Sequence, residues 1–189
     1  MRPPDERRGR WLHAAAFAWG LAEATFFFLV PDVLLTMIAQ RRGFRSAAVA
    51  TIFTVLGAAI GGALMWWLGR DHREAVLAFL DCLPAISPEM IADAEPAMTL
   101  DPFAALLSGA FSGVPYKVFA AVAAHADLSA IGFLLLTIPA RAARFLLASA
   151  VTVVADRVLA RWITRRARIV ILVGGWVAFY TAYWSLMPN

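Results

Sequence analysis

Five charged residues lie within or beside long apolar stretches of the sequence, and they are the candidates for chemistry. They are the acids Glu23 and Asp32 in the first half of the chain and the bases Lys117, Arg141 and Arg144 in the second half. A charge at bilayer depth costs about 2.5–3.5 kcal/mol on insertion scales, so such residues normally face the protein interior and pair with one another. Two acids and three bases sum to +1, which suits a phosphate or another anion bound by Arg. A carboxylate in such a site could also exchange protons.

The same residues also admit a structural interpretation, in which they are ion pairs that hold the fold together. Asp32 could cap the helix that follows it, since Asp is a favoured N-cap residue. Arg141 could extend its guanidinium to the membrane interface while its stem stays in apolar surroundings. Arg141 and Arg144 are three residues apart, so in a helix they share one face.

Other chemistry finds no support in the sequence. The histidines, His13, His72 and His125, are far apart and lack metal-ligand spacing. Ser108 and Ser112 have no neighbouring base, and neither a Gly-rich phosphate loop nor a nucleophile elbow occurs. Cys82 is the single cysteine, which excludes an internal disulfide. The sequence therefore predicts no enzyme, no metal site and no cofactor.

The elements that must position the five charges are apolar. Hydrophobic residues make up 61% of the chain and charged residues 16%, against about 45–50% and 25% in soluble domains. Runs near the length of a membrane span indicate a multi-pass membrane protein. Apolar units are predicted at 11–39, 46–68, 103–124, 128–155 and 169–186. The net charge of +4 comes from bases between these units, so it indicates topology rather than nucleic-acid binding.

Charge predicts the topology of these units. Basic clusters occur at 2–10, 41–45 and 157–168, and the positive-inside rule assigns all three to the cytoplasm. Unit 11–39 must then enter the membrane and return, with its break at Pro31, which disfavours helix at the preceding residue. Unit 103–124 must do the same from the acidic side, with its break at Gly113 and Pro115. A single tilted crossing by 11–39 remains an alternative, because 33–39 makes only about 10 Å of helix.

The two breaks share a local pattern, Val30-Pro31-Asp32-Val33 and Val114-Pro115-Tyr116-Lys117-Val118. Since they enter from opposite faces, the predicted fold is all-α with two re-entrant helix pairs in an inverted repeat and about three transmembrane helices. Gly57 and Gly61 fit a small-residue helix-packing motif. The predicted segments are a basic cytoplasmic N-terminus (1–10), a re-entrant hairpin with a transmembrane helix (11–69), an acidic extracytoplasmic connector (70–101), a second hairpin with a transmembrane helix (102–155), a basic cytoplasmic segment (156–168) and a C-terminal transmembrane helix (169–189).

The order of these motifs resembles a known family. Glu23 with Pro31-Asp32, Gly57-xxx-Gly61 with Gly69-Arg70, Gly113-Val-Pro-Tyr-Lys-Val-Phe119, and Arg141 to Arg144-Phe145 are similar to the DedA family of VTT-domain (SNARE-associated Golgi protein-like) membrane proteins, in its smaller bacterial branch. The resemblance covers about Leu12 to Ser149. It implies facing re-entrant helices, an acidic pair at Glu23 and Asp32, and an arginine pair at Arg141 and Arg144 that activity requires. It also implies flipping of undecaprenyl phosphate or other phospholipids, dependence on the proton motive force, and a role in envelope integrity. The long acidic connector and the tight spacing of the two arginines depart from the family pattern.

These observations predict a transporter or lipid flippase in the bacterial inner membrane, multi-pass and with a cytoplasmic N-terminus. Its expected partners are membrane lipids, chiefly an anionic lipid or a lipid-linked phosphate, with protons as a coupling ion, no nucleic acid, and a homo-oligomer left open. The alternative is a non-transporting membrane scaffold for envelope integrity. An intramembrane enzyme is disfavoured because no nucleophile–base pair is visible.

Overall fold

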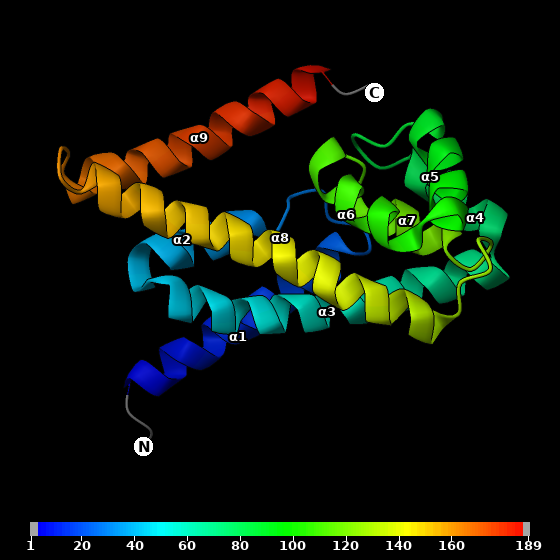
Figure 1. Cartoon of the computed structure of the whole chain (residues 1–189), viewed down its shortest axis with the longest axis horizontal. Helices are drawn as coiled ribbons and strands as arrows, with labels where there is room; N and C mark the ends of the chain where they lie inside the picture. The colour runs from blue at the N-terminus through cyan, green and yellow to red at the C-terminus, as the bar shows by residue number, and fades with distance from the viewer. Residues whose placement is uncertain (1–3, 187–189) are drawn as a thin grey trace.

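The regular elements of the described chain are all α-helices. The computed structural model describes residues 4–186, so the first three residues of predicted segment 1–10 and the last three of 169–189 lie outside the described residues. The helices are α1 (Pro4–Glu23), α2 (Asp32–Arg42), α3 (Phe44–Asp71), α4 (Arg73–Asp81), α5 (Pro88–Leu100), α6 (Pro102–Ser112), α7 (Tyr116–Val122), α8 (Ala130–Leu159) and α9 (Arg165–Leu186) (Figure 1).

Three of the described helices, α3, α8 and α9, are long and apolar enough to cross a membrane. They contain 28, 30 and 22 residues, and at about 1.5 Å per residue each reaches the roughly 30 Å of a hydrocarbon core. Their positions match the predicted units 46–68, 128–155 and 169–186. The prediction of a helical membrane protein is confirmed at this level.

Units 11–39 and 103–124 are each divided into two shorter helices. The first divides between α1 and α2 at residues 24–31, where Pro31 precedes the first turn of α2. The second divides between α6 and α7, where Gly113 has a φ of 91° and Pro115 is extended. A positive φ strains any residue with a Cβ, so Gly at 113 ends α6 at low cost. The two breaks are called break 1 (24–31) and break 2 (113–115) below.

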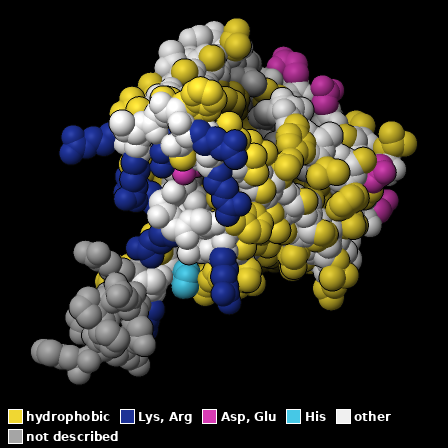
Figure 2. Space-filling view, turned by 60° about the vertical axis from the view of Figure 1, so that its left-hand side comes forward, with side chains coloured by type: hydrophobic (Ala, Val, Ile, Leu, Met, Phe, Trp, Pro, Cys, Tyr) yellow, Lys and Arg dark blue, Asp and Glu magenta, His cyan; other side chains and the backbone are white. Residues whose placement is uncertain are grey.

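The ends of the molecule differ in charge. In Figure 1 the α2–α3 and α8–α9 turns lie at the left, while α4 and α5 lie at the right. The basic residues Arg41, Arg42 and Arg45, with the arginines around the α8–α9 turn, gather at the left end, which Figure 2 turns toward the viewer. The acidic connector forms the opposite end. Helices α1 and α2 both reach the basic end, so break 1 points toward the middle of the molecule (Figure 1).

The connector 70–101 is folded onto the body. It forms α4 and α5 and contributes Leu80, Ile86 and Met98 to the same buried cluster as α7. Ser87 accepts a hydrogen bond from the Met90 N–H at 3.3 Å and is followed by proline, so it caps the start of α5. The connector therefore closes the acidic end of the helices that hold break 2.

Glycines allow α3 to contact its neighbours closely. A Cβ at Gly57 would lie 2.1 Å from the Phe17 carbonyl oxygen in α1, and a Cβ at Gly61 would lie 2.8 Å from the Ala24 Cβ. A Cβ at Gly69 would lie 2.0 Å from the Ala121 oxygen in α7. Because α3 touches α1 and α7 at these glycines, it fixes the distance between the two breaks.

Gly57→Ala is expected to lower the free energy of unfolding by about 1–3 kcal/mol, because backbone atoms of α1 cannot yield to the added methyl group. The measurement is the melting temperature of the purified protein in detergent. Gly174→Ala in α9 is the matched control, since a Cβ at Gly174 meets nothing within 4 Å. Equal melting temperatures for the two variants would contradict this view of the α1–α3 contact.

Candidate functional site: a charge cluster at two helix breaks

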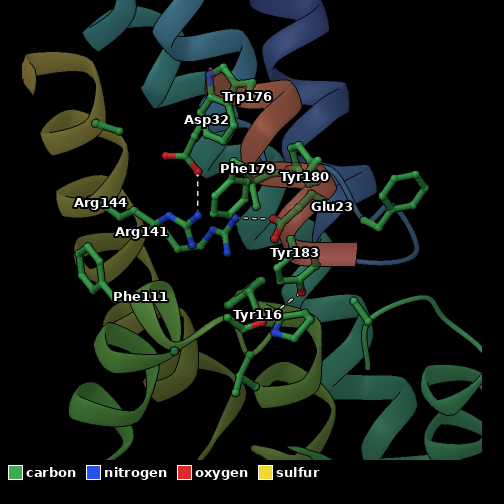
Figure 3. A pocket seen from close by; sticks show the side chains of 18 of the residues that line it. Glu23, Asp32, Phe111, Tyr116, Arg141, Arg144, Trp176, Phe179, Tyr180 and Tyr183 are labelled. Carbon is green, nitrogen blue, oxygen red and sulfur yellow. Dashed lines mark hydrogen bonds and ion pairs between the residues drawn. The ribbon is translucent and has the colours of Figure 1, made fainter. Parts of the chain in front are cut away.

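Five charged residues from both halves of the chain surround one cavity. Glu23 ends α1, Asp32 begins α2, Lys117 lies in the first turn of α7, and Arg141 and Arg144 lie near the middle of α8. Each break ends its helices inside the molecule, so the charges at those ends reach a common space. Figure 3 shows Arg141 and Arg144 extending from α8 toward Glu23 and Asp32. The five predicted residues are therefore neighbours in the fold.

Arg141 and Glu23 form the most deeply buried ion pair among the described residues. The Arg141 Nη2 donates to Glu23 Oε2, and their side chains are 10% and 8% exposed. The Arg141 guanidinium carbon also lies 4.3 Å from the centre of the Tyr116 ring and 5.0 Å from that of Phe145. A planar guanidinium can pair and stack at once, which a Lys ammonium cannot do equally well. Arg141 thus points into the protein and does not extend to the interface.

Asp32 and Arg144 form a second, more open pair. The Arg144 Nη2 lies 3.0 Å from Asp32 Oδ2, with the Asp32 side chain 3% exposed and the Arg144 side chain 27% exposed. Apart from this ion pair, neither Asp32 carboxylate oxygen has a hydrogen bond to another residue in the structure, and no side chain caps α2. The Asp32 carboxylate is therefore not used as a helix cap. A buried carboxylate with unused acceptor capacity and an accessible partner is characteristic of a binding or proton-exchange site.

Lys117 joins the first turn of α7, which directly follows break 2, to break 1. Its ammonium donates to the Phe27 carbonyl oxygen in break 1 at 2.9 Å, and the residue is 3% exposed. Its neighbour Tyr116 is also buried, donates to Thr137 at 3.3 Å and stacks on Phe133. Residues 116–117 thereby fix break 2 against α8 on one side and break 1 on the other.

The cavity that these charges face has a volume of about 760 Å³. Its charged residues are the five of the cluster, and the remaining wall is largely apolar side chains from α6, α8 and α9. The formal charge of the cluster, two acids against three bases, is +1. A polar end and an apolar wall suit a ligand with an anionic group. No group of three metal-ligating side chains occurs among the described residues.

Sequence reasoning missed the contribution of α9. The predicted unit 169–186 was an ordinary span, but Trp176, Phe179, Tyr180 and Tyr183 line the cavity. Their spacing of three to four residues places them on one helix face. Aromatic residues with polar tips in the middle of an apolar span were the signal that could have indicated a polar neighbour, because such tips need hydrogen-bond partners when buried.

No protein-family model, curated protein or solved structure matches the chain. The resemblance to the DedA family therefore rests on the sequence motifs alone, and the function is argued from the geometry of the cluster.

Proposed function

We propose that this protein moves an anionic lipid, a lipid-linked phosphate or a small anion across a membrane. The observation that supports this most is the charge cluster itself, five ionisable side chains around a 760 Å³ cavity between helices that include two candidate spans. Ionisable residues are costly inside a membrane and are usually retained there for transport or proton transfer. An ordinary structural core would need neither the cavity nor the open pair of Asp32 and Arg144.

The proposal includes the topology. Helices α1 and α2 form a re-entrant pair that enters from the basic end, and α6 and α7 form a second pair that enters from the acidic end. Break 1 and break 2 then meet at bilayer depth as the two halves of an inverted repeat. Irregular backbone is tolerated at that depth only where protein buries it or where it lines a water-filled cavity. The contact between Lys117 and Phe27 supports this meeting of the breaks.

Within this proposal, the two ion pairs have different tasks. Arg144 is the most exposed cation of the cluster and binds the phosphate or other anionic group. Asp32 competes with that anion for Arg144, so anion binding releases the carboxylate to accept a proton. The exchange couples anion movement to protons without a metal or cofactor. The DedA resemblance points to the same substrate class and to the bacterial inner membrane.

The experiment that tests this function is lipid translocation in proteoliposomes. The purified protein is reconstituted with a fluorescent short-chain lipid that carries an anionic headgroup, and its movement between leaflets is followed by quenching from outside. A matched zwitterionic lipid measures selectivity for charge, and a radiolabelled inorganic phosphate measures small-anion transport. If the protein accelerates none of these, with or without a proton gradient, the alternative of a non-transporting scaffold for envelope integrity is preferred.

The topology has its own prediction. In a Cys82→Ser background, a cysteine at Asp93 is expected to react with an impermeant maleimide in intact cells, and a cysteine at Arg42 is expected to be protected. Both positions are exposed on the protein, so protection reports the side of the membrane. The measurement is gel-shift labelling before and after permeabilisation. Labelling of Arg42→Cys in intact cells would show that unit 11–39 crosses fully or that the orientation is reversed, and labelling at Asp93 separates these outcomes.

A further inference from the structure

Helix α9 differs from the other two candidate spans in how it contacts the protein. Half of the most apolar 18 residues of α3 are buried, and 28% of those in α8, but none of those in α9. In Figure 1, α9 runs along one side of the molecule and is joined to it through the turn from α8. The apolar surface of α9 contributes no buried side chain to the body. Its position must therefore depend on a few specific contacts.

One set of contacts fixes the base of α9. Arg168 Nε lies 2.7 Å from Asp156 Oδ1 at the end of α8, and its Nη1 donates to the Ile163 carbonyl at 3.1 Å. Gln40 at the end of α2 donates to the Arg168 carbonyl at 3.0 Å. These bonds join the first turn of α9 to both α8 and α2, which makes the base a fixed point.

A second set holds the rest of α9, and it consists of aromatic side chains with polar tips. Trp176 Nε1 donates to Thr36 Oγ1 at 3.0 Å. The Tyr180 hydroxyl accepts the Val30 N–H of break 1 at 2.8 Å, and the Tyr183 hydroxyl donates to the Gly113 carbonyl of break 2 at 3.4 Å. One helix thus satisfies a backbone donor of break 1 and a backbone acceptor of break 2, groups that a continuous helix would have bonded internally.

The same helix forms a side wall of the cavity. Ile171, Gly175 and Phe179 of α9 line it, as do Leu147 and Val151 of α8. If α9 moved away from α8, the cavity would open sideways toward the surrounding lipid. In a bilayer, lipid chains replace apolar helix contacts at little cost, so the polar tips supply most of what holds the wall in place.

We propose that α9 is the lateral gate of the charge cluster. It pivots at its base, where Arg168 is held by α8 and α2, and it is latched by the hydrogen bonds of Trp176, Tyr180 and Tyr183. This inference rests on the proposed function, because it gives a lipid-linked anion a sideways route to Arg144. The latch joins both breaks to one helix, so opening the gate frees backbone groups of both breaks at once. Movement of α9 therefore couples substrate entry to rearrangement of the two re-entrant pairs.

The first experiment measures access and does not depend on transport. Ala148 lines the cavity, and its replacement by cysteine in a Cys82→Ser background reports how readily a thiol reagent enters. Adding Tyr180→Phe and Tyr183→Phe removes the latch hydroxyls while keeping the rings, and is expected to raise the labelling rate at Ala148→Cys at least several-fold in lipid nanodiscs. The control position is Asp93→Cys on the exposed surface of α5, where the rate is expected to stay the same. An unchanged rate at Ala148→Cys would overturn the gate.

The second experiment locks the helix. Phe28 and Trp184 pack edge to face with ring centroids 5.1 Å apart, so a cysteine pair there can be joined by a short reducible bis-thiol reagent. Joining this far end is expected to reduce lipid translocation at least about tenfold, which corresponds to about 1.4 kcal/mol in the barrier, and reductant is expected to restore it. The same cysteine pair without the reagent measures the effect of the two substitutions alone. Full transport with the far end locked would overturn the gate.

The two experiments separate the gate from the proposed function. If the unmodified protein translocates nothing but the latch variants still open the cavity to thiol reagents, the transport proposal fails and the movable wall stands. If the protein translocates lipid and neither labelling nor locking has an effect, transport stands and α9 is a fixed wall.

Discussion

Arg144→Ala is expected to reduce anionic-lipid translocation by about a hundredfold or more while leaving the fold intact. The loss follows from the role of Arg144 as the accessible cation of the cavity, since truncating one partner of a desolvated charge-assisted contact costs about 2–5 kcal/mol. Removing Arg144 leaves the buried Asp32 carboxylate without its ion-pair partner, which lowers stability. The fold is expected to persist because Asp32 can take up a proton, as the proposed exchange requires, and because the half-open Arg144 side chain leaves a partly solvated gap. The measurement is the proteoliposome assay with equal amounts of reconstituted protein.

Two further variants separate charge from geometry at this position. Arg144→Lys keeps the positive charge but loses the planar fork, so it is expected to recover only part of the activity. Arg161→Ala near the α8–α9 turn removes an exposed arginine outside the cavity and is expected to transport normally. Wild-type translocation by Arg144→Ala, with normal insertion, would remove Arg144 from the site and leave the cluster as a structural device.

The sequence predicted the helical spans and the breaks because these depend on composition and on local backbone chemistry. Long apolar runs indicate α3, α8 and α9 regardless of their partners, and Pro31, Gly113 and Pro115 interrupt helices through their own φ preferences. Helix ends were less predictable. The polar first turns of α1 continue the helix before Trp11, and α2 extends past the predicted exit arm to Arg42, where Gly43 has a positive φ.

The membership of the cluster was predictable, but its pairing was not. Opposite charges in two halves of an apolar chain must meet somewhere, because an isolated buried charge is too costly. The rotation of α8 about its own axis cannot be predicted from the sequence. That rotation decides that Arg141 pairs with Glu23 and Arg144 with Asp32. Lys117 bonds a backbone carbonyl rather than an acid, and Tyr180 and Tyr183 bond backbone groups at the breaks. Such partners depend on tertiary position and leave no pattern in the chain.

Removing one member of the Glu23–Arg141 pair is expected to have the largest effect on stability. Glu23→Leu leaves the Arg141 guanidinium buried without its carboxylate and raises the formal charge of the cluster from +1 to +2. Breaking a buried pair in this way typically costs about 3–5 kcal/mol. Arg141→Met is expected to cost a similar amount, because it leaves Glu23 unpaired and also removes the contacts with the rings of Tyr116 and Phe145. The measurement is unfolding by SDS titration from mixed micelles.

The double variant Glu23→Leu/Arg141→Met decides whether these losses belong to the pair. It restores the formal charge of +1 and replaces both ions with apolar side chains, a change that is often neutral or stabilising in a buried site. Most of the lost stability is therefore expected to return. The double-mutant cycle is then expected to give a coupling energy of about 3 kcal/mol or more between the two residues. If the double variant is as unstable as the sum of the single variants, Glu23 and Arg141 act independently. If it regains stability and also translocates lipid, the Glu23–Arg141 pair holds the site together. The Asp32–Arg144 pair then carries out the exchange of anion and proton.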